Sequence, residues 1–219
     1  MIKGTTVITL LSEKGGVGKS FLAREVMASM ERMGDDAELV NIDPQYAVAS
    51  SVGGHDIAVL DTPGHLGNRF DLLVAVSDVI IIPTRPTAAN VEPLCRVVSL
   101  VRAATDVPVL IVVDGWNRHS ACEVWMAWLA KWIRDEDIDG HDVFIIPQSE
   151  AIARAELSGT SVVEAARHGY ARGLSGLVME VVNAARRAAR LDEDVTLDGT
   201  HAASDATDVL SSAQAVLTE

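Results

Sequence analysis

The sequence predicts an α/β fold in which helices cover both faces of a mostly parallel, twisted sheet. Short apolar runs rich in β-branched residues alternate along the chain with stretches that carry apolar residues at helical spacing. One such run, residues 79–83, is apolar at every position, as a strand buried on both faces requires. A glycine-rich turn joins the first apolar run to the first helical stretch, so the chain opens with a strand, a tight turn and a helix.

The expected elements follow one another in a regular order. Strands are expected over residues 5–11, 37–42, 57–60, 78–83, 107–113 and 141–146. Helices are expected over residues 66–77, 91–104, 121–134 and 174–190, together with a first helix that carries Leu22, Val26, Met27 and Met30 at helical spacing.

The helix expected over residues 121–134 is apolar nearly all round. Trp125, Trp128 and Trp132 share one of its faces. A helix of this kind is either deeply buried or partly an interface. We expect core packing with a partner contact at one edge, and core packing alone is the alternative.

The length and composition predict one globular domain with an acidic tail. With 219 residues, of which 48% are hydrophobic, the chain can bury a full core. Residues 191–219 carry seven acidic side chains and no lysine or arginine, so we expect a domain over 1–190 and a disordered tail over 191–219. The net charge of −13 argues against nucleic acid, but residues 151–190 carry six arginines against three glutamates. The acidic average therefore leaves room for a local basic surface.

Further features of the sequence predict a reduced, cytoplasmic protein that does not bind membranes. Cys95 and Cys122 are too few for a disulfide framework. No apolar run approaches the length that spans a bilayer, and the sequence starts directly into a strand without a signal-peptide pattern.

Residues 12–20 have the features of a phosphate-binding loop. Glycines allow the backbone to turn its N–H groups inward around an anion, and the start of the next helix adds the positive end of its dipole. Lys19 can then reach the β- and γ-phosphates of a nucleotide, and the Ser20 hydroxyl can ligate Mg²⁺. The residues expected to bind the nucleotide here are Lys14, Gly15, Gly16, Val17, Gly18, Lys19, Ser20 and Phe21.

This loop departs from the ordinary pattern G-x-x-x-x-G-K-[ST]. The first glycine of that pattern would stand at Glu13, and a second lysine, Lys14, stands five residues before Lys19. This segment of sequence resembles the deviant Walker A box of the ParA/MinD family of ATPases. The resemblance covers about residues 1–190 and implies a P-loop NTPase fold, the cofactors ATP and Mg²⁺, and an ATP-dependent homodimer in which Lys14 reaches the partner subunit's nucleotide. The alternative is a glycine-rich turn with two solvated lysines.

Two aspartates follow expected strands. Asp43 opens the segment Asp-Pro-Gln, which the ParA/MinD family has in its first switch, and the resemblance implies that Asp43 positions the attacking water. An Asp-Pro turn signal is the alternative for Asp43. Asp61 ends a buried apolar run, as in a Walker B strand, and is expected to hold Mg²⁺ with Ser20. Only seventeen residues separate Asp43 from Asp61, fewer than family members usually have, so this chain has either a minimal version of the interval or an unusually short first switch.

Three further positions are compared with the family. The resemblance implies that Asn117 contacts the adenine, a loop cap being the alternative, and that Pro147 belongs to the adenine-side loop. Arg85 lies at the proline-rich end of a strand that resembles short plasmid-partition ParA proteins. It is either a solvated surface arginine or an interface or phosphate contact.

Arginines late in the chain are the expected DNA contacts. Arg186, Arg187 and Arg190 are expected to project from the face of the last helix opposite its apolar stripe, and Arg172 lies just before that helix. In the ParA family, arginines near this end bind DNA nonspecifically. The alternative is a solvated helix face near a C-terminus, where cations are favoured in any case.

The resemblance implies an ATPase for DNA partition, in which a nucleotide-sandwich dimer binds DNA nonspecifically and so associates with the nucleoid. A ParB-like or ribbon-helix-helix adaptor would stimulate hydrolysis. One alternative is a ParA-like ATPase that positions another cargo, such as a microcompartment or a protein cluster. The other is an ATP-binding switch with little turnover. An iron–sulfur relative is disfavoured because the chain has no Cys-x-x-Cys, and a MinD-type membrane protein because it ends in an acidic stretch.

Overall fold

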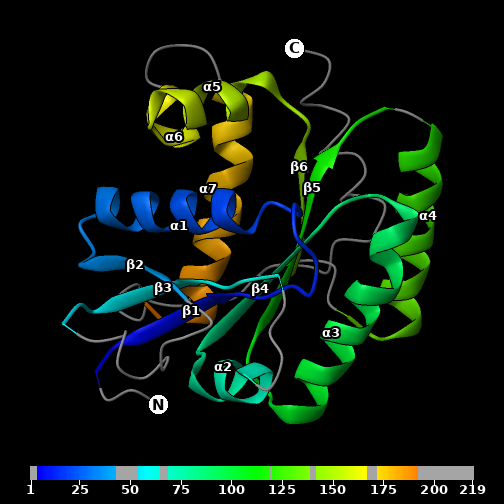
Figure 1. The fold of residues 1–219 in the computed structure, drawn as a ribbon, viewed down its shortest axis with the longest axis horizontal. Coiled ribbons are helices and arrows are strands. Elements are labelled where there is room, and N and C mark those ends of the chain that lie inside the picture. The colour runs from blue at the N-terminus through cyan, green and yellow to red at the C-terminus, as the bar shows by residue number, and fades with distance from the viewer. Residues whose placement is uncertain are drawn as a thin grey trace, which may run out of the picture.

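A computed structural model describes residues 4–42, 54–64, 69–118, 120–138, 142–166 and 172–191. The six strands of this part of the chain form one sheet in the order β2-β3-β1-β4-β5-β6 (Figure 1). Their bounds are β1 (Thr6–Leu10), β2 (Ala37–Asn41), β3 (Ile57–Asp61), β4 (Val79–Thr84), β5 (Val109–Trp116) and β6 (Val143–Pro147). Asp43 and the acidic stretch 192–219 lie outside the described residues.

All neighbouring strands in this sheet run parallel. β1 lies inside the sheet, with β3 on one side and β4 on the other. The loops that follow the strands therefore gather at one edge of the sheet, which is where open α/β sheets bind their ligands. The predicted α/β fold with a mostly parallel sheet is confirmed.

Helices cover both faces of the sheet (Figure 1). One face packs against α2 (Phe70–Val76), α3 (Val91–Ala104) and α4 (Ser120–Asp135). The other packs against α1 (Lys19–Met33), α5 (Glu150–Ser158), α6 (Val162–Ala165) and α7 (Arg172–Ala188). Successive side chains of a strand point to opposite faces of the sheet, so Val7 and Ile8 of β1 pack into different core clusters. The continuous apolar runs of the sequence follow from this burial on both faces.

Two of these helices, α5 and α6, were not among the expected elements, because nine and four residues are too few for a clear helical period. Local capping defines them instead. Ser149 accepts a hydrogen bond from the Ala151 N–H, Ser161 accepts one from the Glu164 N–H, and Gly159 ends α5 in the left-handed conformation.

The tryptophan-bearing helix α4 belongs to the core. Trp125 is buried, and Trp128 and Trp132 are partly buried and stack on each other with ring centroids 5.8 Å apart. Val124 on the same helix is 73% exposed, so the helix is not buried all round. The prediction of core packing is confirmed for this helix, and the partner contact at its edge stays a prediction.

Candidate nucleotide-binding site

A pocket of about 590 Å³ opens at the carboxyl edge of the sheet. Segments far apart in the sequence line it. The first part consists of Gly15, Gly16, Gly18, Lys19, Ser20 and Phe21 after β1, with Thr62, Pro63 and Gly64 after β3. The second part consists of Arg85 after β4, Asp114 and Gly115 of β5, and Gln148, Ser149, Ile152, Ala153 and Glu156 after β6. We call these two parts the β1–β3 end and the β5–β6 end of the pocket.

The loop between β1 and α1 turns on two glycines. Gly16 and Gly18 both have positive φ, 73° and 92°, which residues with a Cβ rarely adopt. Gly18 is the N-cap of α1 and has no side chain with which to cap it, and the first turn of α1 carries no acidic residue. The first N–H groups of the helix are therefore left for an anion bound in the pocket.

Lys19 is buried within this loop. Its Nζ donates a hydrogen bond to the carbonyl oxygen of Lys14 at 2.7 Å. Burial lowers the pKa of Lys19, and the nearby charge of Asp61 acts in the opposite direction. In the described structure the ammonium group thus has the loop carbonyl as its hydrogen-bond acceptor, and a phosphate can replace that carbonyl as its partner.

Asp61 ends β3 and has a buried carboxylate oxygen without a partner. Among the described residues, Oδ1 of Asp61 makes no hydrogen bond. An orphaned carboxylate oxygen is costly unless a cation or donor satisfies it. Ser20 supplies a hydroxyl from the first turn of α1, directly after Lys19, on whose pKa the charge of Asp61 acts. Oxygen ligands of this kind are what Mg²⁺ requires, so the residues present fit a magnesium ion.

The segment after β3 is fixed tightly against the loop after β1. Thr62 donates a hydrogen bond from Oγ1 to the Leu10 carbonyl at 2.6 Å. A Cβ on Gly64 would lie 3.1 Å from the backbone nitrogen of Gly15. The hydrogen bond of Thr62 and the close approach of the two backbones at Gly64 hold the two loops together, so Asp61 and Lys19 keep their relative positions.

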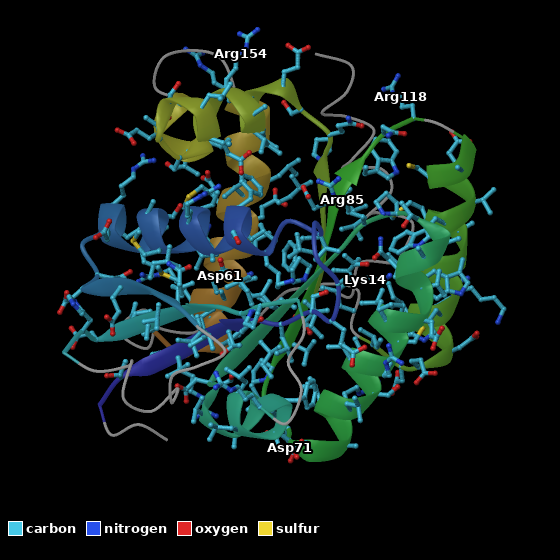
Figure 2. The ribbon with its side chains drawn as sticks, in the orientation of Figure 1. Lys14, Asp61, Asp71, Arg85, Arg118 and Arg154 are labelled. Atoms are coloured by element: carbon cyan, nitrogen blue, oxygen red, sulfur yellow. The ribbon has the colours of Figure 1, made fainter. Side chains whose placement is uncertain are left out.

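The residues expected to bind the nucleotide do not all line the pocket. Gly15, Gly16, Gly18, Lys19, Ser20 and Phe21 line the pocket, whereas the side chain of Val17 packs in the interior. The Lys14 side chain is exposed and does not line the pocket of this subunit. Figure 2 labels Lys14, Asp61 and Arg85 around the middle of the molecule, with Asp71 of α2 at its lower edge. Transfer of Lys14 to a partner subunit stays a prediction.

The two residues expected at the adenine lie beside the pocket. Asn117 donates a hydrogen bond from Nδ2 to Oε1 of Gln148 at 3.2 Å, and Pro147 is the last residue of β6. Gln148 itself lines the pocket, and its N–H donates to the Trp116 carbonyl at 2.7 Å. The described structure thus places Gln148 at the pocket and Asn117 behind it, so an adenine contact by Asn117 or Pro147 stays a prediction.

Asp114 is a pocket residue that we did not identify from the sequence. Its side chain is only 5% exposed, and its Oδ2 accepts a hydrogen bond from Nη2 of Arg85 at 3.3 Å. Burial raises the pKa of the Asp114 carboxyl, and the Arg85 guanidinium opposes that rise. The available signal was a carboxylate at the carboxyl end of a parallel strand, the same position that drew attention to Asp43 and Asp61.

One of the late arginines, Arg186, does not project freely into solvent, which corrects the expectation for this residue. Arg186 forms an ion pair with Asp35 and is largely covered, because α7 packs its last turns against the end of α1. Arg187 and Arg190 are exposed, but α7 ends at Ala188 and Arg190 adopts a φ of 57° beyond it. Arg172 is the first residue of α7, about 22 Å along the helix axis from Arg187.

No helix of the described residues combines the length and hydrophobicity needed to cross a bilayer. The two cysteines of the chain, Cys95 in α3 and Cys122 in α4, are free thiols.

Comparisons with known proteins agree with this geometry. None of the curated proteins matches the sequence significantly. Among solved structures, the chain resembles a putative plasmid partition protein of Borrelia burgdorferi bound to AMPPNP, with 15% identity, a TM-score of 0.57 and coverage of 72% of this chain and 90% of that one. It also resembles MinD in the MinC:MinD complex of Aquifex aeolicus, with 14% identity, a TM-score of 0.62 and coverage of 90% and 99%. The ATP complex of a substituted McdA from Cyanothece gives 11% identity, a TM-score of 0.64 and coverage of 90% and 99%.

At these identities the solved structures establish the fold alone. The family assignment comes from the sequence itself. The model of the CobQ/CobB/MinD/ParA nucleotide binding domain matches residues 8–162, which is more than half of the chain and runs from β1 through α5. The predicted resemblance to ParA and MinD is confirmed, and this chain belongs to the CobQ/CobB/MinD/ParA nucleotide-binding family.

Proposed function

We propose that this protein is a Mg²⁺-dependent ATPase that dimerises on ATP, binds DNA nonspecifically and positions a plasmid or chromosomal locus. The observation that carries the proposal is the pocket lined by the glycines and Lys19 of the loop after β1, with the unpartnered carboxylate oxygen of Asp61 close enough to Lys19 to act on its pKa. Solved structures of the same fold hold AMPPNP, Mg-ADP and ATP, and the one with AMPPNP is a putative plasmid partition protein of Borrelia burgdorferi.

The residues of the β1–β3 end have distinct tasks in this proposal. Lys19 and the N–H groups at the start of α1 bind the phosphates, and Ser20 and Asp61 hold Mg²⁺. When bound, Mg²⁺ neutralises charge on the phosphate oxygens. Asp43 orients the attacking water. Phosphoryl transfer needs mainly positioning and charge neutralisation, which these groups supply.

Dimerisation completes the site. Lys14 follows β1 in the same loop as Lys19 but has an exposed side chain that does not line its own pocket. A cation in that position is free to approach the nucleotide of a second subunit facing the same edge of the sheet. ATP then holds two subunits together, hydrolysis loosens them, and a ParB-like or ribbon-helix-helix adaptor accelerates the cycle.

DNA binding is assigned to Arg187 and Arg190, with Arg172 as a separate contact near the start of α7. Arg186 is left out because it already pairs with Asp35. Three exposed arginines per subunit are a small electrostatic footprint, so useful affinity requires the dimer. Six neutralised phosphates per dimer predict that the logarithm of the binding constant falls with the logarithm of salt concentration with a slope of about −5.

The test is binding of the purified protein to an arbitrary DNA duplex with ATP, ADP or no nucleotide, at a series of salt concentrations. We expect ATP-specific binding that salt weakens and that Arg187→Ala/Arg190→Ala reduces. Arg186→Ala is the matched control on the same helix and should leave DNA binding intact in the folded fraction. Binding that is independent of nucleotide, or that survives the double substitution, would contradict this assignment.

The short first switch favours a second candidate, a nucleotide-dependent switch with slow turnover. Seventeen residues between Asp43 and Asp61 leave little chain to reorganise around a γ-phosphate. Phosphate release measured with and without DNA separates the two candidates. Stimulated multiple turnover supports the ATPase, whereas ATP-dependent dimers that release phosphate no faster with DNA support the switch.

A further inference from the structure

We propose that Arg85 contacts the bound nucleotide at the ribose and first phosphate, and that the buried carboxylate of Asp114 positions it there. The inference rests on the proposed function in one respect, namely that the pocket holds a nucleotide. It assigns a cation to the middle of the site, separate from the two lysines of the loop after β1.

The place of Arg85 follows from the order of the strands. β4 lies between β1, which leads to the phosphate-binding loop, and β5, which neighbours β6. Arg85, which Figure 2 labels, directly follows β4, and its guanidinium group reaches Asp114 of β5. A nucleotide with its β- and γ-phosphates over the β1–β3 end and its base toward the segments after β5 and β6 places its ribose and first phosphate beside β4, where Arg85 begins the β5–β6 end.

The guanidinium group of Arg85 has N–H donors that make no hydrogen bond to the described residues. Among the described residues, Asp114 is its single hydrogen-bond acceptor, reached by Nη2 at 3.3 Å. Gly115 has a φ of +79°, and a Cβ there would meet the guanidinium at 3.8 Å, so glycine keeps this side of the group open. The side chain is 50% exposed and lines the pocket. An arginine has five N–H donors, and those unused here are available to ribose hydroxyls or a phosphate oxygen.

The buried position of Asp114 allows its carboxylate to orient the Arg85 guanidinium group. Asp114 is buried, and its Oδ2 would lie 2.7 Å from a Cβ placed on Gly18, so the carboxylate packs directly against the phosphate-binding loop. A carboxylate beside bound phosphates would repel them if it stood alone. Paired with Arg85, it contributes little net charge and fixes the direction of the guanidinium group. Asp114 is therefore a positioning residue, and Arg85 makes the contact.

The test measures the affinity of unlabelled ATP and ADP by calorimetry, without DNA or any partner. Arg85→Ala is expected to weaken ATP and ADP by the same factor, about tenfold or more, because both ligands carry the ribose and first phosphate. Asp114→Asn should weaken both by less, and should have no added effect in the Arg85→Ala background. Arg85→Lys keeps the charge without the forked donors and should recover part of the affinity. Arg102→Ala is the control, because Arg102 donates to the Glu136 carbonyl and does not line the pocket.

Three outcomes would overturn the inference. Unchanged affinities in Arg85→Ala would remove the contact, and a loss confined to ATP would move it to the γ-phosphate. A further loss from Asp114→Asn in the Arg85→Ala background would show that Asp114 acts independently of Arg85. Thermal unfolding of each variant reports whether it folds, and Arg85→Lys keeps the test available if Arg85→Ala does not fold. A wild-type protein that binds no nucleotide would refute the proposed function as well, whereas failure confined to the variants would refute this inference alone.

Discussion

The two ends of the pocket are built in different ways. At the β1–β3 end, backbone N–H groups and Lys19 after β1 and residues 62–64 after β3 come from two short segments that each follow one strand. At the β5–β6 end, side chains from three separate segments converge, among them Arg85, Asp114 and Gln148. The β1–β3 end depends on local backbone conformation, and the β5–β6 end depends on how distant segments pack.

This difference has a consequence for substitutions. A backbone-built site responds strongly to any change at its glycines or its lysine, because no other group can take over the same geometry. A site assembled from several side chains distributes its contacts, so each single change is expected to cost less. Substitutions at the two ends should therefore differ in the size of their effects.

Lys19→Ala is expected to have the largest effect. Removing the buried ammonium should lower ATP turnover by roughly 100-fold or more, because no other described cation is buried at the β1–β3 end. Phosphate release at saturating ATP measures the effect. Lys131→Ala, which removes an exposed lysine paired with Asp135 on α4, serves as control and should turn over ATP at the normal rate. Equal rates for Lys19→Ala and wild type would show that the phosphates bind elsewhere.

Gly18→Ala tests how much the backbone conformation of the phosphate-binding loop contributes to stability and to ATP binding. Gly18 combines a φ of 92° with the close approach of the Asp114 carboxylate, so the substitution should lower the free energy of unfolding by about 1–3 kcal/mol and weaken ATP binding. Gly34→Ala is a well-matched control, since Gly34 has a φ of 93° and a Cβ added there would meet nothing within 4 Å. Chemical unfolding should therefore show a smaller loss for Gly34→Ala and normal ATP binding. If the two variants lose the same stability, the contact with Asp114 carries no cost.

Ile152→Ala examines the apolar wall at the β5–β6 end. This side chain lines the pocket from α5, and its loss should weaken ATP binding by about tenfold or less. Leu157 on the same helix is 89% exposed and outside the pocket, so Leu157→Ala should bind ATP normally. Calorimetric titration with ATP distinguishes the variants. A loss as large as that of Lys19→Ala would contradict the contrast between the two ends.

Glu25 joins α1 to α6 outside the pocket, and its effect on stability should depend on pH. This buried side chain of α1 accepts hydrogen bonds from the N–H groups of Val162 and Val163 at the start of α6. Burial raises the pKa of Glu25 above its ordinary value of 4.5, against the effect of these hydrogen bonds. The folded state therefore holds this proton more tightly than the unfolded chain, and the contribution of Glu25 to the free energy of unfolding falls as pH rises from about 4.5 through the folded pKa.

Urea unfolding between pH 4 and 8 measures this effect, which we expect to be the smallest of the four. The decline in the free energy of unfolding with rising pH should be shallower in Glu25→Gln than in wild type. Glu123→Gln, at an exposed position of α4, should follow the wild-type curve. Identical pH profiles for Glu25→Gln and wild type would show that Glu25 titrates alike in the folded and unfolded states.

The sequence determined those features whose cause is local. The strand, glycine turn and helix at residues 6–33 could be predicted directly from the sequence. The spacing of their apolar residues, the glycines that adopt positive φ and a helix start without a capping side chain all lie within one short stretch. The helix α3 was predicted with its observed bounds, since fourteen residues carry a clear helical period. Asp61 was identified for the same reason, as the end of a buried run.

The tertiary structure decided what depends on contacts between distant residues. Arg186 has the same sequence signal as Arg187, yet it is covered because α7 brings it to Asp35, 151 residues away in the chain. The pair that Asp114 forms with Arg85 could be recognised only after β4 and β5 paired and brought the two side chains together. The period of a helix or strand fixes which residues share a face, but the partner of each side chain is set by the packing of whole elements, and this packing made the β5–β6 end of the pocket.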